Sequence, residues 1–112
     1  MKLSNEIIKI VKDNDFSIEE IEYYVGINQY TPCGEDWWES IWFDGTDKDF
    51  IKGVETRYEN FDVDEEVELW IESRGRNGVP SSIRELVEDA EWKKEKLRNL
   101  YEQLKGATIW IG

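Results

Sequence analysis

Residues 22–43 read EYYVGINQYTPCGEDWWESIWF, and this stretch decides the fold. Residues 22–30 are rich in β-branched and aromatic side chains that alternate between two faces. Residues 37–43 have the same character, and the segment between them contains a proline and a glycine. The pattern predicts two strands that pair as an antiparallel hairpin.

Three helices are expected around this hairpin. The first follows Ser4, the second follows Thr46, and the third begins at Ser82 and ends at the C-cap glycine Gly106. In each case, apolar residues recur at intervals of three or four after a residue that favours the N-cap.

Four other segments complete the predicted order. Ser17 and Glu20 have the spacing of a capped helical turn, and residues 66–71 alternate apolar with acidic or aromatic side chains, as in a third strand. Residues 73–80 (SRGRNGVP) predict a loop. Residues 107–111 are expected to form either an extra edge strand or a plug over the core.

The resulting order, α-β-β-α-β-α, predicts a single α+β domain over residues 1–112. A right-handed crossover makes the second and third strands parallel. With the first strand between them, the expected three-stranded sheet is antiparallel and has the spatial order 2-1-3. Apolar side chains fall on both faces of the second strand. Therefore, either helices cover both faces of the sheet or one aromatic face is exposed.

The negative charge of the chain is concentrated in one region. The whole chain has a formal net charge of −12, and 14 of its 26 acidic residues lie between Thr31 and Glu72, with only three basic ones. Aromatic residues are also dense there, which predicts a folded, acidic surface rather than a disordered tail. Such a surface attracts basic partners and repels nucleic acid and anionic lipid.

Several kinds of chemistry are excluded by composition. The chain has no histidine and one cysteine, so it holds neither a Ser-His-Asp triad nor a histidine-ligated metal, and no internal disulfide. No apolar run approaches the roughly 20 residues of a membrane-spanning helix. The N-terminus lacks the pattern of a secretory signal. We therefore expect a cytoplasmic protein that makes no membrane contact.

Two acidic segments have some features of a cation site. Residues 62–66 (DVDEE) have oxygen ligands at alternate positions, but Val67 stands where a calcium-binding loop needs glycine. Residues 44–49 (DGTDKD) are explained by the end of a hairpin and a helix N-terminus. A catalytic carboxylate would need a pKa raised by burial, and most of these side chains are predicted at the surface. We expect no metal, no cofactor and no enzymatic activity.

The tryptophan-rich hairpin suggests two functions, a stacking platform for nucleobases or a contact surface for a protein. The surrounding acidic residues disfavour the first, because they repel the phosphates of a nucleic acid. Trp37, Ile41 and Phe43 are predicted in the core. Trp38, Trp42 and Trp70 are the aromatic side chains expected to contact a protein partner.

The acidic residues suggest DNA mimicry. On a strand, Asp64, Glu66 and Glu68 would form a row of carboxylates about 6.6 Å apart. Duplex DNA also presents a regular array of anions, so such a row would satisfy the lysine and arginine side chains of a DNA-binding groove. Composition alone favours the simpler interpretation that the charge maintains solubility.

The strings YVGINQYTPCGEDWWESIWFDGT, NFDVDEEVELWI and VPSSIRELVEDAEW resemble the N-terminal module of ArdA-type antirestriction proteins. The strings YTPCGEDWW and NFDVDEEVELWI are also similar to segments of small uncharacterised proteins of Firmicutes phages and mobile elements. ArdA-type proteins are acidic DNA mimics, usually dimeric, that occupy the DNA-binding groove of type I restriction-modification enzymes. By matching position, the resemblance implies an acidic face of Glu35, Asp36, Glu39, Asp44, Asp47, Asp49, Glu55, Glu59, Asp62, Asp64, Glu65, Glu66 and Glu68. The chain lacks the downstream part of that family, and it carries a basic cluster in its last helix.

Together these observations predict an anti-defence protein of a bacterial host cytoplasm. It would act as a DNA mimic on a basic DNA-binding protein, either a restriction-modification or a CRISPR-associated enzyme, and the resemblance allows a homodimer. The alternative is a protein-interaction module of a phage or mobile element that uses the exposed aromatic side chains without DNA mimicry.

Overall fold

The computed structural model describes residues 3–43, 45–74 and 82–111. The chain belongs to the predicted α+β class and contains three strands and four helices within these residues. In chain order the elements are α1 (Asn5–Asp13), β1 (Ser17–Ile21), β2 (Tyr24–Tyr30), β3 (Asp36–Trp42), α2 (Asp47–Glu59), α3 (Val63–Arg74) and α4 (Ile83–Ile111).

The sheet has the order β1-β2-β3, and both neighbouring pairs are antiparallel. The predicted hairpin is confirmed as β2 and β3, which pair from Tyr24 opposite Trp42 to Tyr30 opposite Asp36. The prediction of a three-stranded antiparallel sheet with this first hairpin strand in its centre is also confirmed.

The second edge strand is not the predicted one. Residues 17–21 form β1, where a helical turn was expected. Asp15 has a positive φ of 68°, which turns the chain back after α1, and Phe16 then enters the core. The carboxylate of Glu20 accepts a hydrogen bond from the backbone N of Leu3 (2.7 Å) instead of capping a helix. A long-range contact therefore replaces the expected local one.

The predicted third strand, residues 66–71, is wrong, because this segment lies within helix α3. Asp62 Oδ1 accepts hydrogen bonds from the backbone N atoms of Asp64 (2.9 Å) and Glu65 (3.3 Å), as an N-cap does. The acidic first turn also interacts favourably with the helix dipole. The burial pattern is helical as well, since Trp70 is buried and Leu69 is 51% exposed, the reverse of the strand expectation.

Helix α4 extends beyond its predicted end. Gly106 is inside the helix rather than at its C-cap, and the backbone of residues 107–111 remains helical. The tail therefore adds no edge strand. The predicted N-terminus is confirmed, because Ser82 Oγ accepts a hydrogen bond from the backbone N of Glu85 (3.2 Å). The predicted loop at residues 73–80 lies largely outside the described residues, and residues 73 and 74 still belong to α3.

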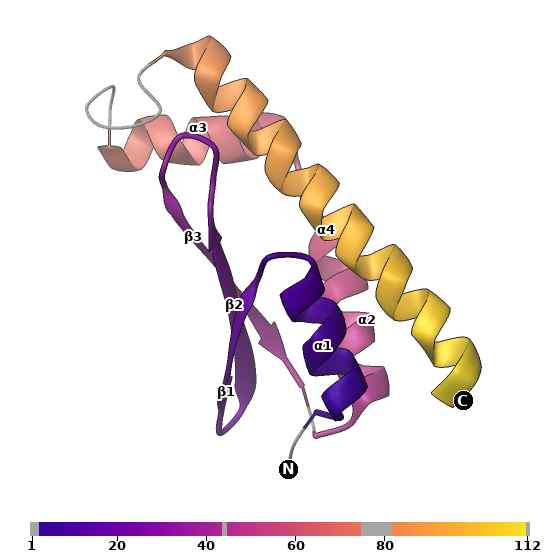
Figure 1. Ribbon diagram of the computed structural model, residues 1–112. Helices are drawn as coiled ribbons and strands as arrows, with labels where there is room; N and C mark the ends of the chain where they lie inside the picture. Colours follow the sequence, from indigo (N-terminus) through magenta and orange to yellow (C-terminus); the bar gives the residue numbers. More distant parts are fainter. Residues whose placement is uncertain (1–2, 44, 75–81, 112) are drawn as a thin grey trace.

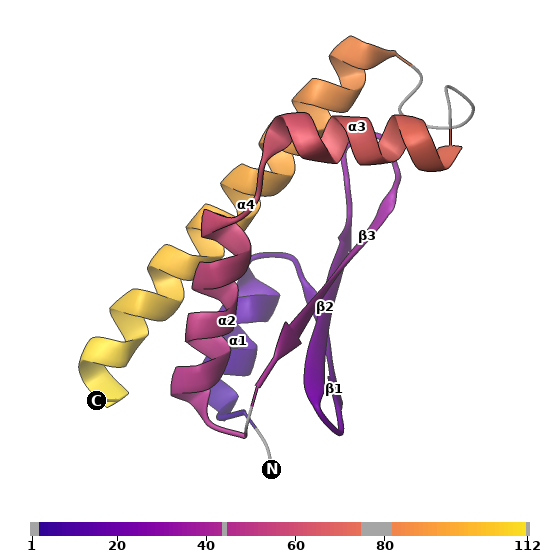
Figure 2. The same ribbon diagram turned by 180° about the vertical axis from the view of Figure 1, so that it is seen from behind.

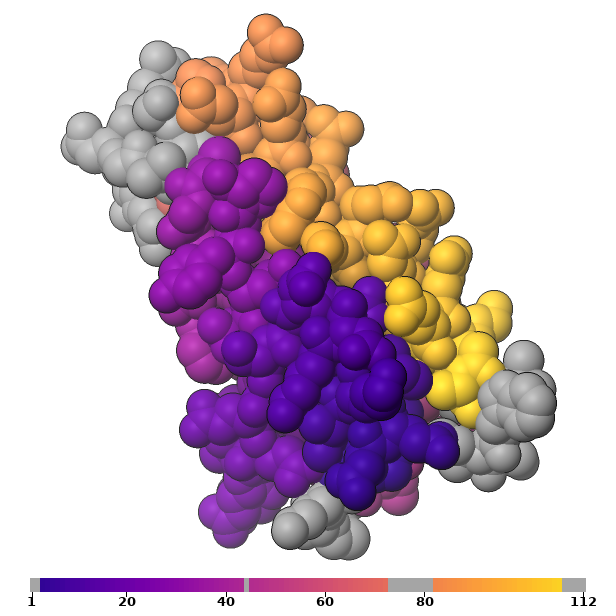
Figure 3. Space-filling view, in the orientation of Figure 1, coloured from indigo at the N-terminus to yellow at the C-terminus, as the bar shows by residue number. Residues whose placement is uncertain are grey.

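Figures 1 and 2 show α1, α2 and α4 on the same side of the sheet. Helix α2 packs on β3, α1 packs on β1, and the long α4 packs on α1, α2 and α3. The space-filling view shows α4 as a diagonal band along one flank of the molecule, next to α1 (Figure 3). The molecule is elongated and measures 45 × 26 × 21 Å.

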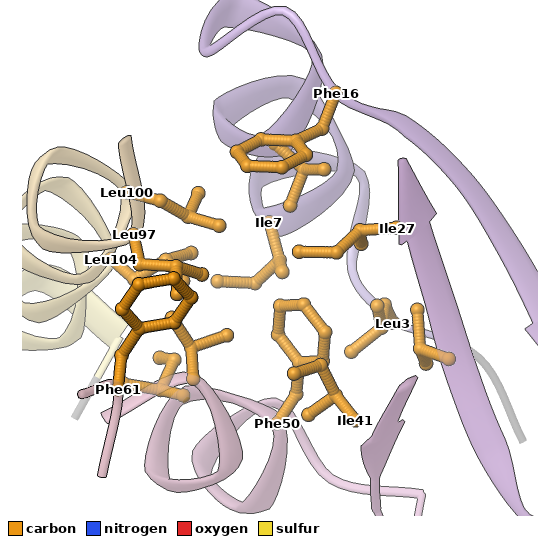
Figure 4. Packing of buried hydrophobic residues seen from close by; sticks show 14 of the residues in the cluster. Leu3, Ile7, Phe16, Ile27, Ile41, Phe50, Phe61, Leu97, Leu100 and Leu104 are labelled. Atoms are coloured by element: carbon orange, nitrogen blue, oxygen red, sulfur yellow. The ribbon is translucent and has the colours of Figure 1, made fainter. Parts of the chain in front are cut away.

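The hydrophobic core lies between this helical layer and the inner face of the sheet (Figure 4). Ile27 and Ile41 from the sheet meet Ile7, Phe50 and Leu97 from three helices. The prediction that Trp37 and Ile41 are core residues is confirmed, and Phe43 packs at the edge of the core. Within the described residues, no helix has the length and apolar character needed to cross a membrane.

Candidate functional site

The outer face of the sheet is open along β3. Every second residue of this strand is exposed, namely Asp36, Trp38, Ser40 and Trp42, while the residues between them are buried. Of the two arrangements that the sequence allowed, the structure has the one in which an aromatic face remains uncovered. Strand alternation produces this face, because one set of side chains must point away from the helices.

One cross-strand row of this face is apolar. Tyr24 lies opposite Ile21 on one side and Trp42 on the other, so one side chain from each strand contributes to the row. The ring centroids of Tyr24 and Trp42 are 6.3 Å apart. Trp42 is 72% exposed, which leaves most of its indole available to a partner.

The next part of the face holds a fixed carboxylate beside an indole. Trp38 lies opposite Asn28 in the register. Asp36 accepts one hydrogen bond on each carboxylate oxygen, from Trp38 Nε1 to Oδ2 (2.9 Å) and from Asn28 Nδ2 to Oδ1 (3.0 Å). Both donors are neutral, so they orient the carboxylate and leave its charge in place.

The indole of Trp38 packs on the sheet at Gly26. A Cβ atom at position 26 would lie 3.4 Å from Trp38 Cζ3 and 3.6 Å from Cε3. The six-membered ring therefore covers the backbone of β2 where a side chain is missing. Trp38 is nevertheless 52% exposed, so a large part of the indole remains accessible to solvent.

The sheet carries no basic residue. Residues 13–47 include ten acidic residues and no lysine or arginine. Glu19 of β1 and Asp36 of β3 are both exposed, and Glu19 pairs with Gly26 in the register. The open face is thus aromatic and acidic, a combination that favours cationic groups and disfavours phosphates.

The predicted aromatic contacts are divided by the fold. Trp38 and Trp42 lie on the same exposed side of β3. Trp70 is 8% exposed and belongs to the buried side of α3, so it is not the exposed aromatic side chain that was expected. Trp37 is buried as well, and its Nε1 donates to Glu39 Oε1 (2.9 Å).

The predicted acidic face is not a single surface. Asp36 belongs to the sheet, Asp47 and Asp49 lie in the first turn of α2, and Glu59, Asp62, Asp64, Glu65 and Glu68 lie at the end of α2 and on α3. Asp44 lies outside the described residues. The carboxylates of Asp64, Glu66 and Glu68 form no strand row, because the segment is helical.

Glu35, Glu39 and Glu55 are among the predicted surface carboxylates that other parts of the protein engage instead. Glu39 is buried and forms an ion pair with Arg57 of α2. Glu55 of α2 accepts a hydrogen bond from the hydroxyl of Tyr101. Glu35 is mostly buried beside Lys93. Glu39 is therefore buried rather than exposed, and Glu35 and Glu55 are only partly exposed, since each of the three satisfies a group from a distant part of the chain.

Lys93 joins three elements through one ammonium group. Its side chain is 4% exposed, and Nζ lies 3.1 Å from Glu35 Oε2, 3.3 Å from Glu66 Oε1 and 3.5 Å from Asp89 Oδ2. Burial raises the pKa of Glu35, although Lys93 opposes this shift. Burial lowers the pKa of Lys93, but the surrounding carboxylates raise it by more. The cluster fixes the β2–β3 turn to α3 and α4.

The α2–α3 corner is the other acidic surface. Glu59, Asp62, Asp64 and Glu65 line a shallow depression of about 430 Å³, which Lys94 also borders. Across the described parts of the chain, no three acidic or cysteine residues form a group suited to a metal ion.

The sequence patterns missed the residues that build the open face around its tryptophans. The patterns predict a helical turn just before Ile21, and they place Tyr24, Gly26 and Asn28 in a strand without indicating a role for them. Their spacing of two was the available signal, because it places all three on the face opposite Val25 and Ile27. Comparisons with protein families, curated proteins and solved structures yield no match to this chain. The resemblance to ArdA-type proteins therefore stays a prediction.

Proposed function

We propose that this chain is a non-enzymatic binding protein that docks a basic partner protein on the open face of its sheet. The observation that carries the proposal is the pair of exposed indoles, Trp38 and Trp42, on a strand whose other side is buried in the core. Exposed aromatic clusters of this kind mark interaction sites, because water solvates them poorly.

The indoles provide most of the expected binding energy. A fully buried aromatic side chain removes about 150–250 Å² of surface from water. Tryptophan is enriched among the interface residues that cost at least about 2 kcal/mol when truncated to alanine. Trp42 supports this role, since it is 72% exposed and its indole lies beside Tyr24, with the ring centroids 6.3 Å apart.

The charge of the face supports a basic partner. The sheet has no lysine or arginine, and the chain as a whole carries −12. Such a field accelerates association with a cationic protein and weakens as salt is added. DNA-binding enzymes, including restriction and CRISPR-associated nucleases, have cationic surfaces of the required kind.

The test is a binding measurement against purified defence nucleases at about 50 and about 300 mM salt, between which the Debye length shrinks by a factor of about 2.5. Wild type is compared with Trp42→Ala and with a double charge reversal on α3, Glu65→Lys with Glu68→Lys. We expect Trp42→Ala to weaken binding by about thirtyfold, the equivalent of about 2 kcal/mol. The α3 reversal should change binding much less.

Two outcomes would contradict this proposal. One is full binding by the Trp42→Ala variant with its fold intact, as judged by circular dichroism and urea unfolding. The other is loss of binding only on α3 charge reversal. Sedimentation velocity on the same samples reports a second copy of this chain as the occupant, which would replace the basic partner.

DNA mimicry is the second candidate function, and a different surface favours it. Asp64, Glu65 and Glu68 are exposed on α3, and no lysine or arginine of the described residues forms an ion pair with them. Carboxylates on a rigid helix are able to replace phosphates in a DNA-binding groove. On this hypothesis the protein inhibits a defence nuclease stoichiometrically, without turnover or cofactor.

The two functions differ in their response to DNA. A mimic competes with duplex DNA for the nuclease, and the α3 charge reversal abolishes that competition. A partner held on the aromatic face is displaced by Trp42→Ala and is indifferent to the α3 reversal. Adding competitor DNA to the binding assay therefore separates the two.

A further inference from the structure

We infer that Trp38 and Asp36 together form a receptor for one arginine side chain of the partner. The guanidinium stacks on the exposed indole of Trp38 and pairs with the carboxylate of Asp36. This inference rests on the proposed function, because it names the chemical group that the open sheet face binds.

The carboxylate of Asp36 is already fixed in position by its hydrogen bonds. Each oxygen of Asp36 already accepts one hydrogen bond from a neutral donor, and each retains a further lone pair. Within the described chain, no lysine or arginine forms an ion pair with Asp36. An incoming cation therefore meets a full negative charge whose position is fixed on both sides.

The indole is held as firmly as the carboxylate. Its Nε1 donates a hydrogen bond to Asp36 Oδ2, and its six-membered ring covers the backbone at Gly26, which has no side chain. These two contacts fix both ends of the ring system and place its remaining surface beside the carboxylate. Little side-chain freedom is left to lose on binding, which favours affinity.

Arginine fits this pair of groups better than the alternatives. Its planar guanidinium stacks on an aromatic ring and donates two parallel hydrogen bonds to a carboxylate, whereas lysine is a compact, strongly hydrated charge. A nucleobase also stacks on indole, but its phosphates would meet Glu19, Asp36 and no cation from residues 13–47. Tryptophan is the most favourable aromatic partner for a cation.

The test uses nuclear magnetic resonance, since each tryptophan contributes one indole N–H signal. The ¹⁵N-labelled chain is titrated at about 150 mM salt, near physiological screening, with the peptide acetyl-Gly-Arg-Gly-amide. Matched peptides carry lysine or citrulline, which is neutral and nearly isosteric with arginine. We expect the Trp38 signal to shift most with arginine, less with lysine and not with citrulline. Asp36→Asn should raise the dissociation constant about tenfold.

Asp64→Asn is the matched control, because it removes one exposed charge from α3 and should leave the titration unchanged. Equal shifts with arginine and citrulline, or no shift of the Trp38 signal, would overturn the inference. So would an arginine dissociation constant that Asp36→Asn leaves unchanged. The dispersion of the other amide signals reports whether each variant is folded.

Failure here and failure of the proposed function are distinguishable. If the peptide leaves Trp38 unaffected while Trp42→Ala weakens binding of a basic protein, the sheet face docks partners without this arginine receptor. If arginine binds Trp38 while no partner depends on Trp42, the receptor exists and the proposed function is wrong.

Discussion

Gly53 of α2 approaches Ile41 of β3 so closely that a Cβ atom at position 53 would lie 2.4 Å from Ile41 Cγ2. Ile41 is fully buried, and the carbonyl oxygen of Trp42 lies 3.3 Å from the same position. The absence of a side chain at Gly53 is thus what lets the helix rest on the sheet. Replacing it should separate the two layers.

We predict that Gly53→Ala destabilises the protein by about 1–3 kcal/mol, the usual cost of overpacking a core. Alanine is the better helix former, so propensity alone predicts the opposite sign. Urea unfolding monitored by circular dichroism gives the free energy of unfolding. An increase in stability would mean that α2 and β3 are not in close contact at this position.

Gly106→Ala is the matched control. Gly106 is also helical, but no atom lies within 4 Å of a Cβ built there. We expect this variant to be stabilised by up to about 1 kcal/mol, because alanine restricts the unfolded chain and favours helix. A clear loss of stability would show that α4 ends near Gly106, as the sequence pattern predicts.

The buried ammonium of Lys93 provides a second prediction. Lys93→Met keeps much of the side-chain volume but leaves Glu35 and Asp89 without their cation. Removing one partner from a buried ion cluster typically costs about 3–5 kcal/mol. The expected loss is near the lower end of that range, since Glu66 is partly exposed.

Its neighbour Lys94 is the control for this substitution. Lys94 is only half-buried and forms no ion pair among the described residues. Lys94→Met should therefore change the free energy of unfolding by no more than about 0.5 kcal/mol. Equal effects of the two substitutions would mean that Lys93 contributes as an ordinary surface lysine.

Glu35 makes the stability depend on pH. Burial raises its pKa in the folded state above the ordinary value of 4.5. The folded protein therefore binds this proton more tightly than the unfolded chain does. Stability from this group falls as pH rises from about 4.5 through the raised pKa, and it is constant above that window.

Glu35→Gln isolates this effect from the other carboxylates. The difference in unfolding free energy between wild type and this variant should move in favour of wild type as pH is lowered through the window. Urea unfolding at a series of pH values measures it, with Glu68→Gln as an exposed reference. A difference that is independent of pH would show that the pKa of Glu35 is not raised.

The hairpin was predictable because its two signals agree. Alternation predicts strands for residues 22–30 and 37–43, and the proline and glycine between them predict the turn. Each signal is local in the sequence. Together with the helical periods on either side of it, this hairpin indicates the α+β class.

Residues 62–72 show where local patterns conflict. Val67, Leu69 and Ile71 alternate as in a strand, while Val63, Val67 and Trp70 repeat as in a helix. Packing against α4 selected the helix, since Val63 and Val67 contact the core. Strand β1 was missed for the related reason that SIEEI, mostly exposed at an edge, carries little hydrophobic pattern.

The candidate site was predictable only in part. Trp38 and Trp42 were identified, because alternation along β3 places them together. The loss of Glu35 and Glu39 from the surface was not predictable, since their partners Lys93 and Arg57 are distant in sequence. Ion pairs between distant elements leave no periodic signal that a sequence pattern could reveal.

The N-cap of α3 is the basis of a final prediction. Asp62 Oδ1 accepts hydrogen bonds from the backbone N atoms of Asp64 and Glu65, and the acidic first turn depends on that start. Asp62→Ala should cost about 1 kcal/mol of stability. Asp62→Asn retains an oxygen acceptor while removing the charge, so it should cost distinctly less.

If both variants lose the same free energy of unfolding, the interaction of the Asp62 charge with the helix dipole, rather than its hydrogen bonds, favours helix over strand in this segment. Urea unfolding distinguishes the two results, and the amide signals of Asp64 and Glu65 report whether the first turn of α3 is retained.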